Sequence, residues 1–308
     1  MDKSATIELL KIMLRQDIAY LCSRSDRLWN EPIVRTLRDL KDDSFSAVFF
    51  GGTLRSLLFS RLLKGTLGRP RDLDIVVSAV TLETLRERFR DIVIRETRFG
   101  GLQLLRSKWQ FDIWPLNSTW AFVKDHYLHP SFDALPSTTF FNLEAIAVEV
   151  WPASGTSRIT YSGDNQFFDG VLSRTLEINR SENPFPTLCI VRALVLASAF
   201  DLNIGPRLVS YLAEHSAKTT NVELDQVQLK HYGVIRHRHF IMRSWLNHIV
   251  RHFGEHGPVQ LRLPLTRQLT LWPENSELWP VLNRFLSKAP PAPRSRVRPS
   301  TGNPGLRA

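Results

Sequence analysis

Two aspartates in the first half of the chain have the spacing of neighbours on one face of a β-strand. Asp72 and Asp74 alternate with Leu73 and Ile75. Because the side chains of a strand alternate between its faces, both aspartates would project together, about 7 Å apart. Two such carboxylates repel each other unless a cation lies between them, and Mg²⁺ prefers oxygen ligands and substrate phosphates. An isolated Asp-x-Asp is more often a solvated strand end, so its interpretation depends on what lies beside it.

A glycine pair follows the apolar segment 47–50. Gly51 and Gly52 would let the backbone approach a ligand closely, and the free N–H groups of the helix expected after them suit a phosphate. Arg55, in the first turn of that helix, could hold a phosphate or pair with a carboxylate. The P-loop and dinucleotide-binding fingerprints are both absent from the sequence.

A third carboxylate, Asp112, lies between Phe111 and Ile113 in a segment that we expect to be a central strand. An aspartate in that position is costly to bury unless it is paired or bound to a metal. On a strand next to Asp72 and Asp74, it would complete a two-metal site. In such a site one ion activates an attacking hydroxyl and the other neutralises a triphosphate and its leaving pyrophosphate. The three features together disfavour a set of unrelated solvated residues.

The spacing of apolar residues predicts the elements that position these side chains. Strands are expected at residues 47–50, 73–77, 92–96, 101–105 and 109–114. Helices are expected at residues 5–22, 30–40, 54–63, 81–89, 184–200, 206–215 and 228–253. The apolar segment 141–150 fits either a strand or a helix.

The order of these segments predicts an α+β fold, in which a small mixed β-sheet with flanking helices is followed by an α-helical body. The expected parts are N-terminal helices (1–44), the head that contains the sheet (45–164), an α-helical neck and body (165–288) and a disordered basic tail (289–308). The tail is rich in proline, serine, glycine and arginine, and it has too few apolar residues to fold.

Composition and charge restrict the class of protein and the kind of partner. The chain has 308 residues, 43% of them hydrophobic, which excludes collagen-like, coiled-coil and wholly disordered proteins. Residues 1–229 contain 27 basic and 27 acidic residues, whereas residues 230–308 contain 13 basic and 3 acidic ones. The whole excess of +10 therefore lies in the last quarter. This asymmetry fits a polyanionic partner bound by that end, or a solvated basic surface with a tail.

Cysteine content and hydropathy bear on the compartment. Two cysteines are too few for a disulfide framework or a cysteine-based zinc site, which favours a reducing compartment. The first residues do not form a secretory signal, and no uncharged apolar run approaches the roughly 18 residues of a membrane span. We therefore expect a cytoplasmic protein.

The segment 228–253 combines basic and aromatic residues, a composition that suits RNA backbone and unstacked bases. The candidate RNA-binding residues are Lys230, Arg236, Arg238, Arg243 and Arg251. A solvated basic face is the alternative. His248, His252 and His256 recur at every fourth residue and could bind zinc, although no glutamate completes a metalloprotease motif.

One arginine, Arg192, lies in the otherwise apolar segment 190–200. A buried arginine needs a partner. We expect Arg192 to pair with Asp169 or Glu182, or to reach a bound nucleotide.

The glycine turn and the Asp-x-Asp strand resemble the head of the nucleotidyltransferases of the polymerase-beta type. Gly51-Gly52-x-x-Arg55, followed by Arg71-Asp72-Leu73-Asp74, is most similar to the bacterial CCA-adding enzymes and poly(A) polymerases. Their heads carry a Gly-Gly-x-x-Arg-Asp turn and then an Asp-x-Asp strand. The resemblance continues more weakly through residues 141–147, 168–170 and 192–193, and covers roughly residues 45–215.

This resemblance implies Mg²⁺-dependent transfer of a nucleoside monophosphate from an NTP, such as ATP, to an RNA 3′ end, such as that of a tRNA. The residues implied to bind two Mg²⁺ ions and to act in catalysis are Asp72, Asp74 and Asp112. Those implied to bind the nucleotide are Gly51, Gly52 and Arg55. The α-helical body would hold the RNA.

The sequence also departs from the family pattern. Ser56 stands where an acidic residue is expected, Glu144 where an asparagine is expected, and residues 138–140 lack the Arg-Arg-Asp that opens the third motif. The Glu-Asp-x-x-Arg template that selects C and A is not recognisable. Two alternatives therefore stay open: a nucleotidyltransferase with a small-molecule or protein acceptor, of the antibiotic or toxin type, and a catalytically degenerate RNA-binding homologue.

Overall fold

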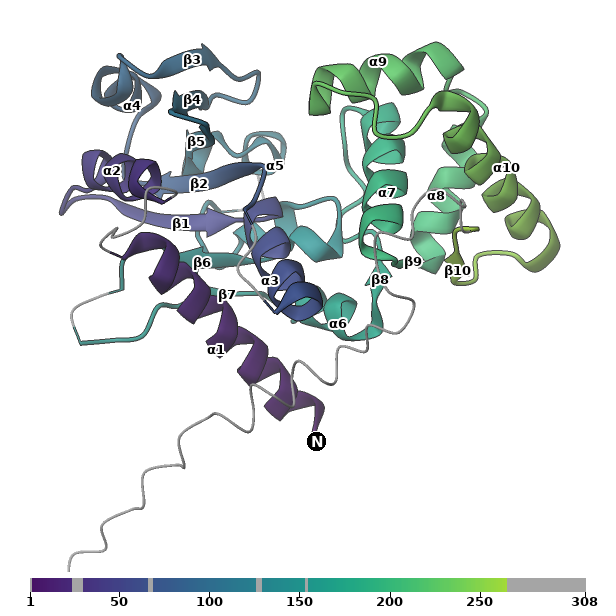
Figure 1. Cartoon of the computed structure of the whole chain (residues 1–308), viewed down its shortest axis with the longest axis horizontal. Helices are drawn as coiled ribbons and strands as arrows, with labels where there is room; N and C mark the ends of the chain where they lie inside the picture. The colour runs from purple at the N-terminus through teal and green to yellow at the C-terminus, as the bar shows by residue number, and fades with distance from the viewer. Residues whose placement is uncertain (1, 24–29, 66–68, 126–128, 153–154, 265–308) are drawn as a thin grey trace, which may run out of the picture.

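A mixed sheet of seven strands forms one side of the molecule and a group of helices forms the other (Figure 1). The structure, a computed structural model, describes residues 2–23, 30–65, 69–125, 129–152 and 155–264. The strands of the sheet are β1 (Ser46–Phe50), β2 (Asp72–Ser78), β3 (Val93–Glu96), β4 (Leu102–Arg106), β5 (Trp109–Pro115), β6 (Ala147–Glu149) and β7 (Thr160–Tyr161). Their order across the sheet is β3-β4-β5-β2-β1-β6-β7.

The strands β2 and β5 lie side by side in the middle of this sheet and pair in parallel. The other pairings, including those of β1 with β2 and β6, are antiparallel. A parallel pair needs a long crossover connection, and here the chain from β2 to β5 passes through a helix and the β3-β4 hairpin. This crossover brings residues almost 40 positions apart in the sequence into register.

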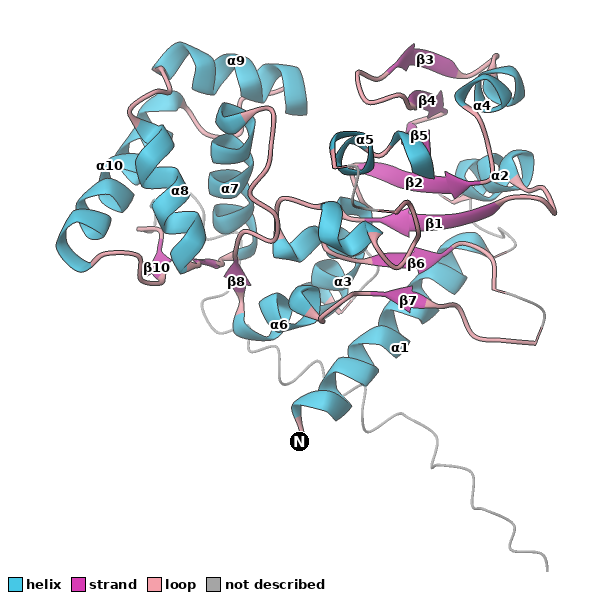
Figure 2. Ribbon diagram, turned by 180° about the vertical axis from the view of Figure 1, so that it is seen from behind, coloured by secondary structure: helices cyan, strands magenta, loops and turns pink. Residues whose placement is uncertain are grey.

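Alternate residues of the central strands face two different layers. Ala47 and Phe49 pack into the larger core, whereas Val48 and Val76 pack into a smaller one on the opposite face. The larger core lies under α1 (Lys3–Cys22), α2 (Glu31–Leu40), α3 (Gly52–Lys64) and α4 (Leu82–Phe89). The smaller one lies under α5 (Trp120–Lys124) and two short 3₁₀ turns, and Figure 2 shows this side of the sheet.

The helical side of the molecule follows the sheet in the sequence. Its elements are α6 (Gln166–Ser173), α7 (Pro186–Phe200), α8 (Pro206–Ser216), α9 (Asn221–Tyr232), α10 (His239–His256) and a small sheet of β8 (Thr175–Leu176), β9 (Asn203–Ile204) and β10 (Leu261–Arg262). Proline in the first turn of α7 and of α8 starts each helix without the loss of a backbone hydrogen bond. The buried side chains of these helices continue the larger core of the sheet.

The α+β fold predicted from the sequence is confirmed, with the expected strands and helices in the expected order. The prediction of one helical region over residues 228–253 is wrong in detail, because Gly233 adopts a left-handed conformation (φ +70°) and ends α9. The ambiguous segment 141–150 forms a 3₁₀ turn, Asn142–Glu144, followed by β6.

Some expectations concern residues or boundaries that the structure does not test. The basic tail, residues 289–308, lies outside the described residues. The boundaries proposed at residues 44, 164 and 288 stay predictions. None of the helices within the described ranges is long and apolar enough to cross a membrane.

The helix α1 carries a buried carboxylate, Asp17, whose ionisation destabilises the folded state. Asp17 is only 3% exposed, and the Nε atom of Arg61 is 3.6 Å from its Oδ1 atom, too far for a good hydrogen bond. Its Oδ2 atom has no hydrogen-bond partner among the described residues. Burial outweighs the attraction of Arg61 and raises the pKa of Asp17 to about 6.

We expect Asp17→Asn to increase the free energy of unfolding at about pH 7.5. A carboxyl whose pKa is raised on folding destabilises the folded state only where it must ionise, so the penalty is absent below its unfolded pKa and complete above about pH 6. A rise from 3.8 to about 6 corresponds to about 3 kcal/mol. Urea unfolding should show this gain at about pH 7.5 and almost none at about pH 4. An equal gain at both pH values would contradict the explanation.

Candidate active site

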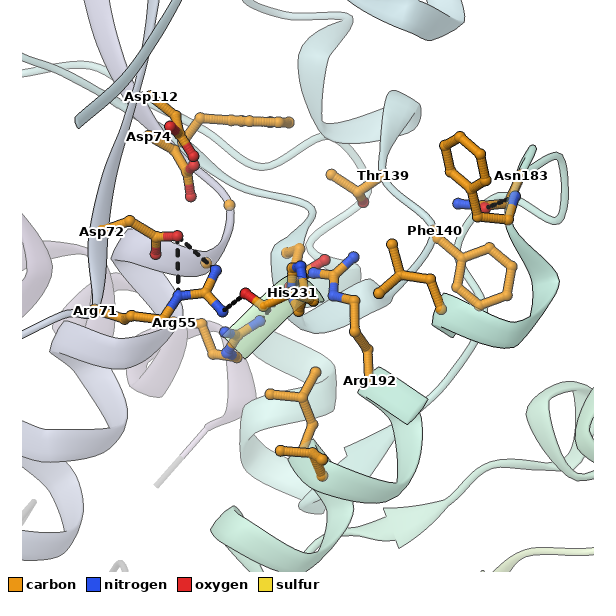
Figure 3. A pocket seen from close by; sticks show the side chains of 18 of the residues that line it. Arg55, Arg71, Asp72, Asp74, Asp112, Thr139, Phe140, Asn183, Arg192 and His231 are labelled. Carbon is orange, nitrogen blue, oxygen red and sulfur yellow. Dashed lines mark hydrogen bonds and ion pairs between the residues drawn. The ribbon is translucent and has the colours of Figure 1, made fainter. Parts of the chain in front are cut away.

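Three carboxylates converge where β2 and β5 pair. The parallel register places Asp74 directly opposite Asp112, and Asp72 lies one step away on the same face of β2. One oxygen atom from each side chain lies within 4.8 Å of the other two. All three lie on the face of the sheet that carries Val76, which is the face under α5. Figure 3 shows the three aspartates beside one another. The sequence-based expectation that these three residues come together is therefore met.

The surroundings make these carboxylates costly to ionise without a cation. Burial raises the pKa of Asp74 well above its usual range, and repulsion from Asp72 and Asp112 raises it further. Burial also raises the pKa of Asp112, although the amide of Gln103 donates a hydrogen bond of 3.0 Å to its Oδ1 atom. A cluster of hard oxygen donors with this repulsion fits a divalent cation such as Mg²⁺, and these three residues are the ones that could hold it.

The glycine turn lies beside the carboxylates. Gly51 adopts φ +55°, a conformation that a residue with a side chain rarely takes, and its N–H donates to the carbonyl of Ile146 at 3.0 Å. A Cβ atom added at Gly52 would lie 3.5 Å from Asp74 Oδ2. The start of α3, whose first N–H groups have no acceptor within the helix, thus lies beside the carboxylate cluster.

A buried threonine fastens this helix start to the carboxylate strand. The Thr53 hydroxyl accepts a hydrogen bond of 2.8 Å from the N–H of Asp74 and donates one of 3.3 Å to the carbonyl of Asp72. The side chain is completely buried. Sequence reasoning did not identify Thr53, and its position directly after the glycine pair was the only signal available.

Arg55 and Arg192 share a single buried carboxylate, Glu144. Arg55 from α3 and Arg192 from α7 both donate to Glu144 Oε1. Burial alone would raise the pKa of Glu144, but the two arginines outweigh it and lower the pKa to about 2. Two cations on one anion leave an excess of one positive charge next to Gly51, which favours an anionic ligand at the glycine turn.

This cluster shows which carboxylate pairs with both arginines, and their expected contact with a nucleotide stays a prediction. Arg55 pairs with a carboxylate of the head, one of the two roles expected for it. The expected partners of Arg192 are wrong, because Asp169 pairs with Lys3 and Glu182 pairs with Arg180. Glu144 lies almost 50 residues before Arg192, so only the packing of α7 against the head brings them together.

Arg71 connects the carboxylate cluster to the helical side. Its Nε atom donates to Asp72 Oδ2 at 3.0 Å, and its Nη1 atom donates to the carbonyl of His231, at the end of α9, at 3.4 Å. The guanidinium also lies over the ring of Tyr232, 5.3 Å from its centroid. Figure 3 shows Arg71 between Asp72 and His231. Arg71 was not singled out from the sequence, because only the fold brings α9 to this position.

These groups line one cavity of about 870 Å³ between the sheet and the helices. His231 and Tyr232 contribute to its wall, and burial, with the nearby Arg192 and Arg71, lowers the pKa of His231 to about 3. This imidazole is therefore neutral at physiological pH. The charged groups that line the cavity are Arg55, Arg71, Arg192, Arg236, Asp72, Asp74, Asp112 and Glu144.

The residues predicted to bind RNA are dispersed over the helical side. Arg236 lines the main cavity, and its guanidinium is 5.7 Å from the ring centroid of Tyr232. Lys230, Arg238 and Arg251 are exposed. Arg243 instead donates to Asn221 Oδ1 and to the carbonyls of Ser216 and Thr219, which favours a structural role at the corner between α8 and α9.

The histidines of α10 do not form a metal site in the part of the chain that the structure describes. The rings of His252 and His256 lie 4.9 Å apart, but no third ligand joins them there. Within the same residues, the aspartate cluster is the group with metal-ligand geometry.

The comparison with solved structures relates this arrangement to known proteins. The CCA-adding enzyme of Thermotoga maritima, solved in complex with tRNA, superposes with a TM-score of 0.50 at 18% sequence identity, over 76% of this chain and 52% of that one. The chain has the fold of the matched part of this CCA-adding enzyme. A tRNA nucleotidyltransferase solved with a primer tRNA and an ATP analogue is also similar, with a TM-score of 0.46 at 17% identity over 72% and 60% of the two chains.

The chain spans about half the length of the CCA-adding enzyme that it matches. No protein-family model matches the sequence, and no curated protein matches it. The structural match to the Thermotoga maritima enzyme confirms, at the level of the fold, the resemblance inferred from the glycine turn and the Asp-x-Asp strand.

We expect Glu144→Gln to destabilise the protein by about 3 kcal/mol. The substitution conserves size but leaves the guanidinium groups of Arg55 and Arg192 without a counter-charge, and removal of one partner of a buried ion pair costs about 3–5 kcal/mol. The measurement is urea unfolding at neutral pH. Glu87→Gln is the matched control, because Glu87 is exposed on α4. Equal effects of the two variants would show that the buried cluster does not stabilise the fold.

We expect Arg71→Gln to tighten divalent-cation binding about fivefold. Arg71 pairs with Asp72 and so competes with a cation for that carboxylate, and a partly exposed ion pair contributes up to about 1 kcal/mol. Titration with Mn²⁺, followed by electron paramagnetic resonance, measures the affinity. Arg69→Gln is the control, since Arg69 contacts the Lys108 carbonyl and the Trp109 ring instead. Unchanged or weaker Mn²⁺ binding in Arg71→Gln would refute the competition.

Proposed function

We propose that this protein is a nucleotidyltransferase that moves a nucleoside monophosphate from an NTP to the 3′ hydroxyl of an RNA. The observation that carries the proposal is the convergence of Asp72, Asp74 and Asp112 beside the glycine-led start of α3. The likeness of the fold to that of a CCA-adding enzyme supports the same class of reaction.

The charges of the cavity support dependence on a divalent cation. Four arginines and four carboxylates line it, so their formal charges cancel over the whole cavity, and the single excess positive charge next to Gly51 is too small to neutralise a triphosphate. Two Mg²⁺ ions held by Asp72, Asp74 and Asp112 would supply that charge and would lower the pKa of the attacking hydroxyl. The pKa values of Asp74 and Asp112 are raised because their negative charges are poorly compensated, and a bound cation would supply that compensation.

The chain's own groups would orient the nucleotide. Gly51 and Gly52 leave room for phosphate oxygens next to the N–H groups at the start of α3. Arg55 and Arg192 remain fixed by Glu144 and would offer their remaining N–H groups to the phosphates. Because these groups are already ordered, little conformational entropy is lost when the nucleotide binds.

RNA is the acceptor that the charge distribution favours. Lys230, Arg238 and Arg251 are exposed on the helical side, and the last quarter of the sequence carries the whole net positive charge. A protein that uses RNA and NTPs in this way, for example in tRNA processing, would act in the cytoplasm. A small-molecule or protein acceptor, or RNA binding without catalysis, would give a different result in the experiment below.

The test is incorporation of labelled nucleotide from each of the four NTPs into total RNA, with and without Mg²⁺. We expect Asp74→Asn to reduce incorporation at least about 100-fold, because it removes a metal ligand while leaving the size of the side chain unchanged. Asp91→Asn is the control, since Asp91 is exposed on the surface. Equal incorporation by wild type and Asp74→Asn would refute the assignment. Label found only outside RNA would show a different acceptor, and no incorporation at all would show a degenerate homologue.

A further inference from the structure

A second cavity, of about 480 Å³, adjoins the main one between the β3-β4 hairpin and the helices α7 and α9. The two cavities share five lining residues: Phe99, Pro184, Phe185, Leu188 and His231. The two cavities are therefore adjacent at these five residues. We refer to the second cavity as the hairpin cleft.

Two aromatic rings stand at the junction of the two cavities. Phe99 comes from the β3-β4 loop and Phe185 from the residue that precedes α7, and their ring centroids are 6.0 Å apart at an angle of 63°. Phe99 is 42% exposed, although burial of such a ring would be favourable. An exposed ring next to a second ring offers a surface on which a flat, unpaired base can stack.

The polar side of the hairpin cleft is positively charged. Arg95, Arg98 and Lys230 line it, and its one carboxylate, Glu96, accepts a hydrogen bond of 2.8 Å from Arg86 outside the cleft. In the described part of the chain, neither Arg98 nor Lys230 forms an ion pair with a carboxylate. Arg98 lies over the Phe185 ring, 5.7 Å from its centroid. Cations beside stacking rings form the pattern that binds single-stranded nucleic acid.

We propose that the hairpin cleft binds the unpaired 3′-terminal nucleotides of the acceptor RNA. Bases would stack on Phe99 and Phe185, while Arg98 and Lys230 would contact the phosphates. A strand bound in this way would pass the five shared residues, and its terminal hydroxyl would lie in the main cavity, which Asp72, Asp74 and Asp112 line. The identity of the ligand as an acceptor rests on the proposed function, whereas the cleft's preference for single-stranded RNA can be tested without it.

The direct test is binding of a fluorescein-labelled RNA hairpin, either blunt-ended or with an unpaired 3′ overhang, in the absence of NTP and divalent cations. We expect the wild-type protein to prefer the overhang, and Phe99→Ala and Phe185→Ala each to bind it about tenfold more weakly. Phe99→Trp should retain binding, because the indole preserves a stacking surface. Ile94→Ala is the control, since Ile94 is 52% exposed on the neighbouring β3 but does not line the cleft.

Salt dependence gives a second readout that does not require a change in the aromatic residues. Each phosphate contact contributes about 0.7 to the slope of log affinity against log salt for single strands. We expect Lys230→Gln to reduce the slope for the overhang RNA by about this amount and to leave the slope for blunt-ended RNA unchanged. An unchanged slope for both RNAs would remove Lys230 from the cleft's contacts and would contradict the proposal.

Kinetic constants separate this proposal from the proposed function. If wild type incorporates nucleotide, Phe99→Ala should raise KM for the RNA about tenfold without a change in KM for the NTP. If Phe99→Ala left KM for the RNA unchanged, or bound the overhang RNA as tightly as Ile94→Ala does, the proposed role of the cleft would be wrong. The proposed function would not be affected by either result. Overhang binding that depends on Phe99, without incorporation by wild type, would support the cleft and overturn the proposed function.

Discussion

Mutual repulsion among three carboxylates at the pairing of β2 with β5 is the constraint on which the site depends. Their oxygens lie within 4.8 Å of one another in a partly buried position, where like charges interact strongly. Two side chains stabilise the carboxylates themselves, because Arg71 pairs with Asp72 and Gln103 donates to Asp112. Thr53 holds the backbone of β2 against the start of α3. A divalent cation held by the three carboxylates would offset the repulsion that remains.

The cluster of Arg55, Glu144 and Arg192 links this chemistry to the architecture. Glu144 lies in the 3₁₀ turn before β6, Arg55 on α3 and Arg192 on α7, so one carboxylate joins the sheet, its covering helix and the helical side. Because all three side chains are mostly buried, a relative movement of these elements would separate charges in a poorly solvated place. The geometry of the cavity is therefore fixed by an interaction that lies in its own wall.

Local patterns predicted the parts of the site that one strand or one turn determines. Alternation along β2 places Asp72 and Asp74 on one face, and the glycine pair marks the start of α3, so both could be read from the sequence. The pairing of Asp74 with Asp112 also required that β5 lie next to β2, which the sequence suggested but did not determine. The pairing of Glu144 with Arg192 and the contact of Arg71 with His231 could not be assigned in this way, because only long-range packing brings α7 and α9 close to the head.

The net charge of a long stretch of sequence does not predict the charges that surround a site within it. The first 229 residues are neutral on balance, yet they contain the negative carboxylate cluster and the three arginines, Arg55, Arg71 and Arg192, that lie near it. The main cavity is balanced, whereas the hairpin cleft beside it carries an excess of positive charge. Under the proposed function, a polyanion would be attracted first to the cleft, and the carboxylate cluster would oppose its approach to the main cavity unless cations were bound there. Phosphate binding beside the carboxylates would then depend on cation binding, whereas the cleft would need no cation to attract a strand.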